Sequence, residues 1–185
     1  NELSVDLVQK YMNVIKRESG AEIDESVETA FDGLYPFNRG FIQMAYNRLL
    51  EDGSPRRTPR VLLPKVVRRV LLSDDPPYEV VSKNPNVDEQ VTPIDPGEYP
   101  NELQKLVTWY GYRDEIREES NEILVHSGVL ETFGFETDGD GTVSHEDAEY
   151  VIFQPNDAAT RILGNSDTSR PSIPPSGDDE FEVPS

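Results

Sequence analysis

The stretch LYPFNRGFIQMAYNRLLEDGSPRRTPRVLLPKVVRRVLL, residues 34–72, carries the strongest helix signals of this 185-residue chain. It opens with a turn whose aromatic side chains, Tyr35 and Phe37, are expected to join the core. Asn38 then predicts the start of a helix over residues 39–52, because its side chain can accept hydrogen bonds from the free N–H groups of the first turn. The apolar residues of this helix recur every three or four positions, as one buried face requires.

A second helix is predicted after the loop, where Thr58 precedes Pro59. A hydroxyl residue followed by proline at the first helical position is a typical start signal. The helix is expected to continue to about Leu72. Pro64 lies inside it and lacks an N–H group, so we expect it to kink this helix or to restart it.

The N-terminal part of the chain is predicted to be helical as well. Residues 3–19 form an amphipathic pattern in which Leu7, Tyr11 and Ile15 share one face. Gly20 is a plausible end for this helix, and residues 21–31 are expected to contain a further short helix.

The C-terminal part is predicted to be more mixed. Residues 73–100 contain six prolines and predict an extended connector, with a short strand at residues 78–82. Residues 101–128 predict two helices, one on each side of Gly111. Residues 129–153 alternate in polarity and end in a β-rich run, which predicts a β-hairpin or small sheet.

The expected fold is therefore mainly α with a small β-hairpin or sheet, in which a helical lid is followed by a winged-helix-like module. Two helices followed by a hairpin is the order of a winged helix-turn-helix. Four segments are predicted: a helical bundle or lid over residues 1–73, a Pro-rich connector over 74–101, a winged-helix-like α+β module over 102–163, and a disordered acidic tail over 164–185.

A basic cluster lies in and just before the second predicted helix. It holds six of the seventeen Lys and Arg residues of the chain and no acidic residue: Arg56, Arg57, Arg60, Lys65, Arg68 and Arg69. Guanidinium groups offer planar forks of donors that match phosphate oxygens, and a helix start adds N–H groups that attract anions. Because like charges this close repel one another, we expect a negative group to face them. The candidates are a nucleotide phosphate, a nucleic-acid backbone and an acidic partner; the alternative is that each cation pairs with a carboxylate of this chain.

The chain as a whole is strongly acidic, with 36 Asp and Glu residues and a net charge of −19. The acids are scattered through every segment outside the basic cluster. Scattered acidity favours a halophilic cytoplasmic protein, whose surface stays hydrated in concentrated salt, over a binding site for basic partners. No run of residues is long and apolar enough to span a bilayer, so no membrane association is expected.

Several kinds of site are excluded or disfavoured by the residue types. The absence of cysteine excludes disulfides and thiolate chemistry, and the spacing of His126 and His145 disfavours a zinc site. Residues 136–147, ETDGDGTVSHED, partly match a calcium loop, but Glu136 and Asp147 have the wrong side-chain length for the first and last ligands. We predict a plain turn there, and no metal site and no catalytic residue in this chain.

An aromatic cluster at Trp109, Tyr110 and Tyr112 is a second candidate for contact with nucleic acid. Side chains of this kind can stack on exposed bases. Within one short helical segment they more often pack in a core, so we predict a packing role.

Residues 34–72 resemble the helical lid of large P-loop ATPases of the AAA+ kind. They are particularly similar to the ATPases of prokaryotic antiviral systems such as bacteriophage exclusion and phosphorothioate-linked restriction. The shared features are the Tyr-Pro-aromatic-Asn turn, the helix after it and the Arg-Thr-Pro-Arg helix start. That family places an arginine near the terminal phosphates of the nucleotide, which implies a nucleotide-sensing role for Arg57 or Arg60. The other members of the basic cluster would then contact phosphate of nucleotide or DNA: Arg56, Lys65, Arg68 and Arg69.

The chain lacks the phosphate-binding loop and the acidic strand end that hold ATP and magnesium in such enzymes. The expected function is that of a non-catalytic nucleotide-sensing or DNA-handling portion of a larger antiviral-defence ATPase, with ATP and Mg bound by the parent protein and no cofactor in this chain. Its expected partners are the ATPase core or other defence-system subunits, and DNA. The alternatives are a free-standing DNA-binding winged-helix module and a protein–protein adaptor that docks through its basic helix.

Overall fold

A computed structural model describes residues 2–52, 58–88, 94, 98–113, 122–137, 142–145 and 147–154. The chain is mainly helical and carries a small antiparallel sheet, as predicted. The elements are α1 (Glu2–Ser19), α2 (Glu25–Ala30), α3 (Arg39–Asn47), α4 (Pro59–Leu62), the π-helical turn η1 (Leu63–Val67), α5 (Arg68–Leu71), α6 (Pro77–Ser82), α7 (Asn101–Tyr110), β1 (Tyr112–Arg113), β2 (Ile123–His126), α8 (Ser127–Thr132), β3 (Thr142–His145) and β4 (Ala148–Phe153).

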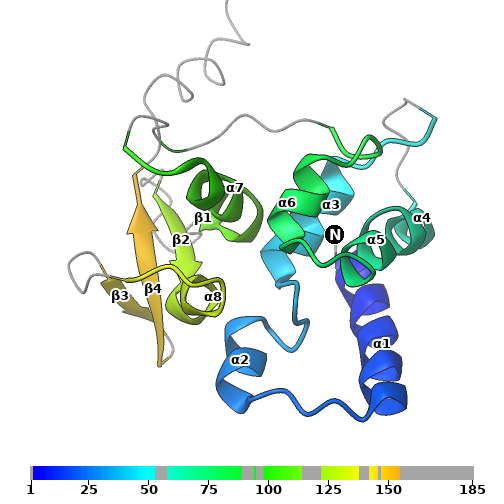
Figure 1. Cartoon of the computed structure of the whole chain (residues 1–185), viewed down its shortest axis with the longest axis horizontal. Helices are drawn as coiled ribbons and strands as arrows, with labels where there is room; N and C mark the ends of the chain where they lie inside the picture. The colour runs from blue at the N-terminus through cyan, green and yellow to red at the C-terminus, as the bar shows by residue number, and fades with distance from the viewer. Residues whose placement is uncertain are drawn as a thin grey trace, which may run out of the picture.

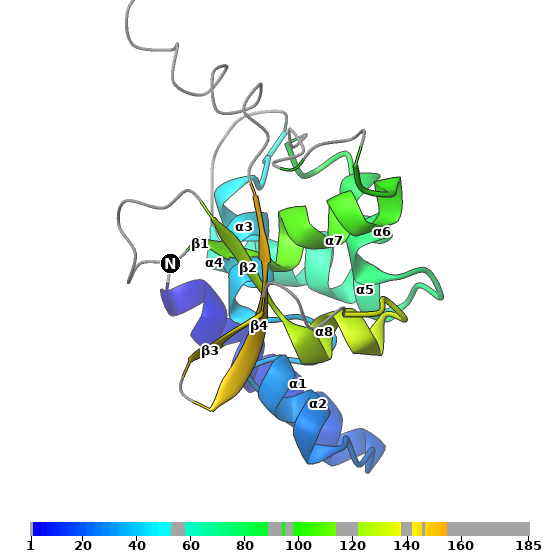
Figure 2. The ribbon, with the colours of Figure 1, turned by 90° about the vertical axis from the view of Figure 1, so that its left-hand side faces the viewer.

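The sheet has the strand order β1-β2-β4-β3, and all neighbouring strands are antiparallel. The register pairs Val125 with Val151 and Val143 with Tyr150. Figure 1 shows the sheet at one end of the molecule and α1 at the other, with α3, α6 and α7 between them. Figure 2 views the molecule from the sheet side and shows α7 and α8 on one side of the strands. Both helices contact β2, whose residues Ile123 and Val125 are buried.

One hydrophobic core joins the helices and the sheet. It contains Val8 of α1, Phe41 of α3, Leu106 of α7 and Val125 of β2, each at most 1% exposed. Residues from the predicted lid and from the predicted C-terminal module therefore pack around the same interior. The predicted tail over 164–185 lies outside the described residues.

The aromatic side chains form the centre of this core, as predicted for packing. Phe31 meets Tyr110 and Phe133 edge to face, with ring centroids 6.0 and 5.9 Å apart. Trp109 and Tyr110 are 2% and 0% exposed, so neither can stack on a base. Such ring pairs add specific geometry to the apolar area that they bury.

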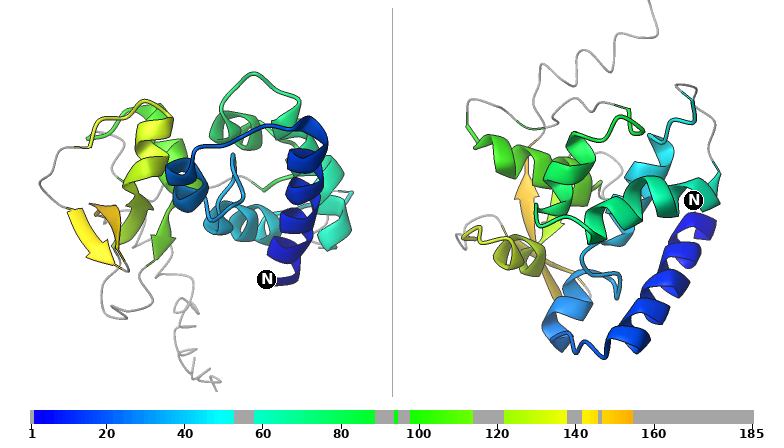
Figure 3. Two further views of the ribbon diagram at one scale, coloured as in Figure 1. Left: turned by 90° about the horizontal axis from the view of Figure 1, so that it is seen from below. Right: turned by 45° about the vertical axis from the view of Figure 1, so that its right-hand side comes forward.

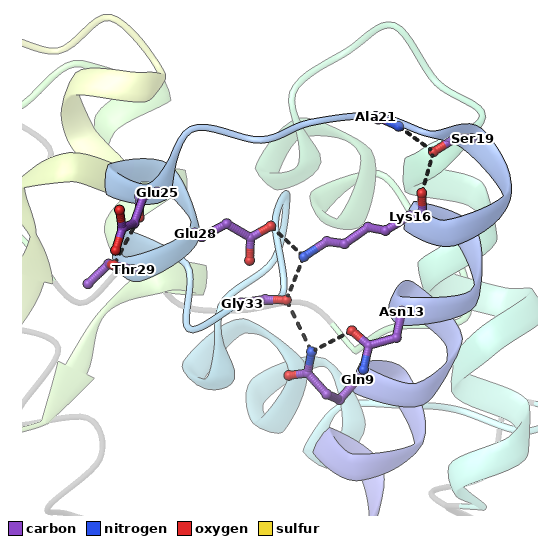
Figure 4. A network of polar contacts seen from close by, with 9 residues as sticks. All are labelled: Gln9, Asn13, Lys16, Ser19, Ala21, Glu25, Glu28, Thr29 and Gly33. Atoms are coloured by element: carbon purple, nitrogen blue, oxygen red, sulfur yellow. Dashed lines mark hydrogen bonds and ion pairs between the residues drawn. The ribbon is translucent and has the colours of Figure 1, made fainter.

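Helix α1 is tied to the turn after α2 by a small polar network, shown in Figure 4. Two side chains of α1 donate to the Gly33 carbonyl oxygen: Lys16 Nζ at 3.0 Å and Gln9 Nε2 at 3.1 Å. Lys16 also forms an ion pair with Glu28 of α2 at 2.5 Å. Gly33 has a φ of 70°, which a side chain would disfavour. Figure 3 shows α2 held between α1 and α8.

Pro64 interrupts the α-helix over residues 59–71: α4 ends at Leu62 and α5 begins at Arg68, with a π-helical turn between them. The residues around Pro64 form the π-helical turn η1, in which the Arg68 N–H donates to the Leu63 carbonyl. Proline removes one α-helical hydrogen bond, and its ring crowds the carbonyl four residues earlier. A wider turn relieves this crowding while the helical course continues. The predicted restart therefore takes the form of a π turn followed by α5, and the predicted kink stays a prediction.

The predicted strand over residues 78–82 is wrong, because these residues lie in helix α6. Pro77 takes the first helical position, where its missing N–H costs no hydrogen bond. Tyr78 and Val81, three positions apart, are both buried on one helical face. Lys105 of α7 then reaches across to Glu79, with Nζ 2.9 and 3.0 Å from its carboxylate oxygens. The prolines here start a helix inside the predicted connector.

Two further predictions after Gly111 are wrong in their type of element. Residues 123–126, expected in the second helix, form strand β2, and helix α8 extends over residues 129–132, where strand was favoured. The order α7, β1, β2, α8, β3, β4 differs from two helices followed by a hairpin, so the winged-helix arrangement is not confirmed.

An added Cβ at Gly111 would lie 2.5 Å from Ile123 Cγ2, so this close packing of β2 requires glycine.

The predicted C-terminal hairpin is confirmed, since β3 and β4 are antiparallel neighbours. His145 and Ala148 are the paired residues next to the turn between the two strands. Asp147 lies in this turn and has a φ of 65°. The glycine-rich residues 138–141 precede β3 and lie outside the described residues. The prediction of a plain turn instead of a calcium loop therefore stays a prediction for those residues.

Candidate functional site

The basic cluster lies largely on the continuous helical segment formed by α4, η1 and α5. This segment begins after Thr58, whose backbone is extended, with Pro59 at the first helical position, as predicted. Its described basic residues are Arg60, Lys65, Arg68 and Arg69. Arg56 and Arg57 lie outside the described residues, so their assignment to phosphate and nucleotide stays a prediction.

One face of the segment is anchored in the core. Leu62, Val66, Val67 and Val70 are all between 0% and 4% exposed. Full burial of an aliphatic side chain stabilises a fold by about 1.5–3 kcal/mol. Four such side chains on one short segment therefore fix which face points into the protein and which points into solvent.

The opposite face carries the exposed residues Arg60, Pro64, Arg68 and Leu72, four positions apart from one another. Eight α-helical residues turn about 80° beyond two full turns, which would displace Arg68 sideways from Arg60. Each residue of a π turn rotates less about the axis, so η1 cancels part of this displacement. The π turn at Pro64 thus brings the two guanidinium-bearing positions closer to one line.

Arg60, Lys65 and Arg68 form no ion pair within the described part of the chain. The described ion pairs use other cations: Lys16 with Glu28, Arg39 with Glu2, and Lys83 and Lys105 with Glu79. Arg60 and Arg68 are exposed, and Lys65 is half-buried. Among the described residues, these three cations are therefore not neutralised by the protein's own carboxylates.

Arg69 differs from its neighbours because a buried side chain holds it. Its Nη1 donates to Asn84 Oδ1 at 3.1 Å, while Asn84 Nδ2 donates to the Lys65 carbonyl at 2.7 Å. Asn84 is 6% exposed and also accepts from the Asn86 N–H at 3.0 Å. Asn84 thus fastens the basic segment to the turn after α6.

Sequence reasoning missed this role of Asn84. Residues 83–86 were predicted to lie in an extended connector, which implies no contact with the basic helix. The available signal was an Asn-Pro-Asn turn, since Asn side chains in turns commonly bond nearby backbone groups. That the turn faces α5 depends on the tertiary fold and could not be deduced from local pattern.

The arrangement suits anion binding better than catalysis. Arg60 and Arg68 present several N–H donors each to solvent, and guanidinium groups bind carboxylate or phosphate through two parallel hydrogen bonds. No three His, Asp or Glu side chains come together within the described ranges as a metal ion would require. Nor is any helix in those ranges long and apolar enough to cross a bilayer.

Comparison with known proteins gives no assignment for this arrangement. No model of a protein family matches the chain, and neither a curated protein nor a solved structure shows significant similarity to it. The resemblance of residues 34–72 to an AAA+ lid therefore remains a prediction that rests on the sequence motif alone.

Proposed function

We propose that this chain binds phosphate groups through the exposed face of the helical segment over residues 59–71. Arg60 and Arg68 would contact the phosphate, with Lys65 and Arg69 beside them. In this proposal the chain is a non-catalytic, nucleotide-sensing or DNA-handling part of a larger cytoplasmic ATPase of prokaryotic antiviral defence.

The observation that carries this proposal is the charge state of that face. The chain contains 36 acidic residues, yet Arg60, Lys65 and Arg68 have no ion pair among the described residues. Unpaired like charges on adjacent turns repel one another by a few tenths of a kcal/mol per pair. A bound dianion would relieve this repulsion and would satisfy the exposed N–H donors.

The resemblance to AAA+ lids supplies the division of roles in the proposal. Arg57 and Arg60 would lie near the terminal phosphates of a nucleotide that an ATPase core binds. Arg56, Lys65, Arg68 and Arg69 would contact further phosphate oxygens of nucleotide or DNA. The partner would be the ATPase core or another defence-system subunit, which would bring ATP and magnesium.

Nucleotide is the better-supported ligand if the protein works in concentrated salt, as its acidity predicts. Affinity for DNA that rests on phosphate contacts falls steeply as salt rises. A terminal phosphate enclosed between a lid and a core is screened much less than an exposed one. The same surface could also serve a DNA-binding module or dock on an acidic protein, and the test below separates these outcomes.

The test is a binding titration of the whole chain with three probes: ATP, a short DNA duplex and inorganic phosphate. Substituting both Arg60 and Arg68 by Gln is expected to weaken binding of the preferred probe at least about tenfold, a typical effect for two charge-assisted contacts. Binding of ATP but not duplex supports nucleotide sensing, and the reverse supports DNA handling. Absence of binding to all three probes would reject phosphate recognition and leave an acidic protein surface as the ligand.

A further inference from the structure

A cleft between the end of α6 and helix α7 lies next to the basic segment. The cleft has a volume of about 400 Å³, and its polar lining includes Ser82, Lys83, Asn84, Asp88, Asn101 and Lys105. Ligand pockets commonly measure about 300–1,000 Å³, so this one has room for a single small polar molecule.

The two lysines at this cleft share one carboxylate partner, Glu79. Lys105 Nζ lies 2.9 Å and Lys83 Nζ lies 3.6 Å from the same Glu79 oxygen. One carboxylate can neutralise only one of the two ammonium groups. Lys83 makes the longer pair, and its side chain is 69% exposed, so it is the cation that an incoming anion can recruit. Asp88 is the one acid in the lining, so the two lysines are matched by two carboxylates, and the site depends on the loose pairing of Lys83 with Glu79.

Asn84 connects the cleft to the basic segment. Asn84 lines the cleft, and its Oδ1 accepts from Arg69 Nη1 at 3.1 Å. Arg69 therefore lies one side chain away from the cleft. Lys83, which precedes Asn84 in sequence, also lines the cleft.

The remaining polar groups of the lining are mostly satisfied within the protein. Ser82 Oγ accepts from Trp109 Nε1 at 3.1 Å and donates to the Tyr78 carbonyl at 2.6 Å. Thr108 Oγ1 donates to the Gln104 carbonyl at 2.7 Å. Donors that can turn towards a ligand are therefore the lysine ammonium groups and the exposed amide of Asn101, which begins α7.

We propose that this cleft binds the phosphate of a single nucleotide unit, as a continuation of the phosphate-binding face on residues 59–71. Lys83 and Lys105 hold the phosphate, and Asn101 is placed to donate to it. Glu79 holds the two lysines in position when no ligand is present and competes with the ligand for them. This inference rests on the proposed function and adds a second subsite to it.

Because Glu79 competes with the ligand for the lysines, substitutions of Lys83 and of Glu79 are expected to change the affinity in opposite directions. Lys83→Gln is expected to weaken binding about threefold to tenfold and to lower the salt dependence by about one counterion, as loss of one phosphate contact requires. Glu79→Gln is expected to strengthen binding severalfold, because both lysines become available. A merely structural role for Glu79 would not raise the affinity.

The probes are adenosine 5′-monophosphate and a single-stranded thymidine oligonucleotide, titrated against the whole chain. If Lys83→Gln weakens and Glu79→Gln strengthens the binding of both probes, the subsite recognises the phosphate group itself. If the two variants change only the binding of the oligonucleotide, the subsite recognises a nucleic-acid strand. Lys10→Gln and Glu18→Gln are the charge-matched controls, since both residues are exposed on α1. Circular dichroism of each variant verifies that it is folded.

Equal affinity of Lys83→Gln and Lys10→Gln for both probes would overturn the cleft subsite. So would equal affinity of Glu79→Gln and Glu18→Gln. If the Arg60 and Arg68 substitutions weaken binding while the cleft substitutions do not, the proposed function stands and only this inference fails. If the unmodified chain binds neither probe, this inference fails, and the proposed function fails with it only if ATP, the DNA duplex and inorganic phosphate are not bound either.

Discussion

The side chain of Asn38 donates a hydrogen bond from Nδ2 to the main-chain carbonyl of Tyr110 at 3.0 Å, across 72 positions of sequence. The same side chain accepts from the Phe41 N–H at 2.8 Å and so caps α3. Tyr110 completes the connection by donating its hydroxyl to the Pro36 carbonyl at 2.6 Å. The turn before α3 and the end of α7 are therefore one structural unit.

Replacing Asn38 by Ala should destabilise the fold strongly. The substitution removes a helix cap, which contributes about 1 kcal/mol, and leaves the Tyr110 carbonyl unsatisfied, which costs about 1–3 kcal/mol more. We expect the free energy of unfolding in urea to fall by about 2–4 kcal/mol. Asn47→Ala, at the exposed last position of α3, is the control and should change stability little. Similar losses for the two variants would contradict this account of Asn38.

Protonation of His126 should destabilise helix α8. Its Nδ1 accepts from the Gly128 N–H at 3.0 Å, a role that only the neutral ring can fill. Burial lowers the pKa of His126 and outweighs the opposing effect of Asp32 and Glu131. Because the folded pKa lies below the unfolded value, the unfolded chain takes up the proton first. The stability contributed by the neutral ring is present above about pH 6.5 and is lost as pH falls towards the folded pKa.

Urea titrations at about pH 7.5 and about pH 5.5 measure this effect, since most carboxylates stay ionised over that range. His126→Asn retains a side-chain acceptor for the cap but cannot titrate, so its stability should depend less on pH than that of the unmodified chain. His145→Asn provides the control for the other histidine and should retain the full dependence. An unchanged pH dependence in His126→Asn would contradict the assignment.

Salt should stabilise this protein. The net charge of −19 implies repulsion between acidic side chains throughout the surface, and added salt shortens the range of that repulsion. We expect the melting temperature to rise by several degrees between about 0.1 M and about 2 M KCl, where the Debye length falls from about 10 Å to below 3 Å. Sorbitol of matched osmolality is the control. A constant or falling melting temperature in KCl would contradict the halophilic interpretation.

Local signals predicted the N-terminal half of the fold well. The cap at Asn38, the helix start at Pro59 and the amphipathic pattern of residues 3–19 each act within one or two turns, so they can be read without knowledge of the tertiary fold. The Thr58 side chain forms no cap hydrogen bond. Tertiary packing decided the elements that were predicted incorrectly. Strand β2 alternates buried and half-buried residues over only four positions, too few to separate a strand from a helix end.

The candidate site shows the same division. Its basic residues and its helix start follow from sequence, because charge and the preference of proline for the first helical position are local properties. The anchoring of Arg69 by Asn84 depends on the packing of α5 against α6. This contact joins segments fifteen positions apart, and no local pattern contains that information.

The most direct test of the central claim compares two double variants of equal charge in phosphate binding. Arg60→Gln with Arg68→Gln removes two charges from the proposed face, and Lys10→Gln with Arg17→Gln removes two from exposed positions of α1, so each changes the net charge from −19 to −21 (−19 − 2). Affinity for ATP and for duplex DNA is measured over a range of KCl concentrations. We predict that only the first variant loses about tenfold or more in affinity for the probe that the unmodified chain binds more tightly. If that probe is the DNA duplex, the slope of log affinity against log salt concentration should also become less steep by about two. Equal affinities and slopes in the two variants would contradict phosphate recognition by Arg60 and Arg68.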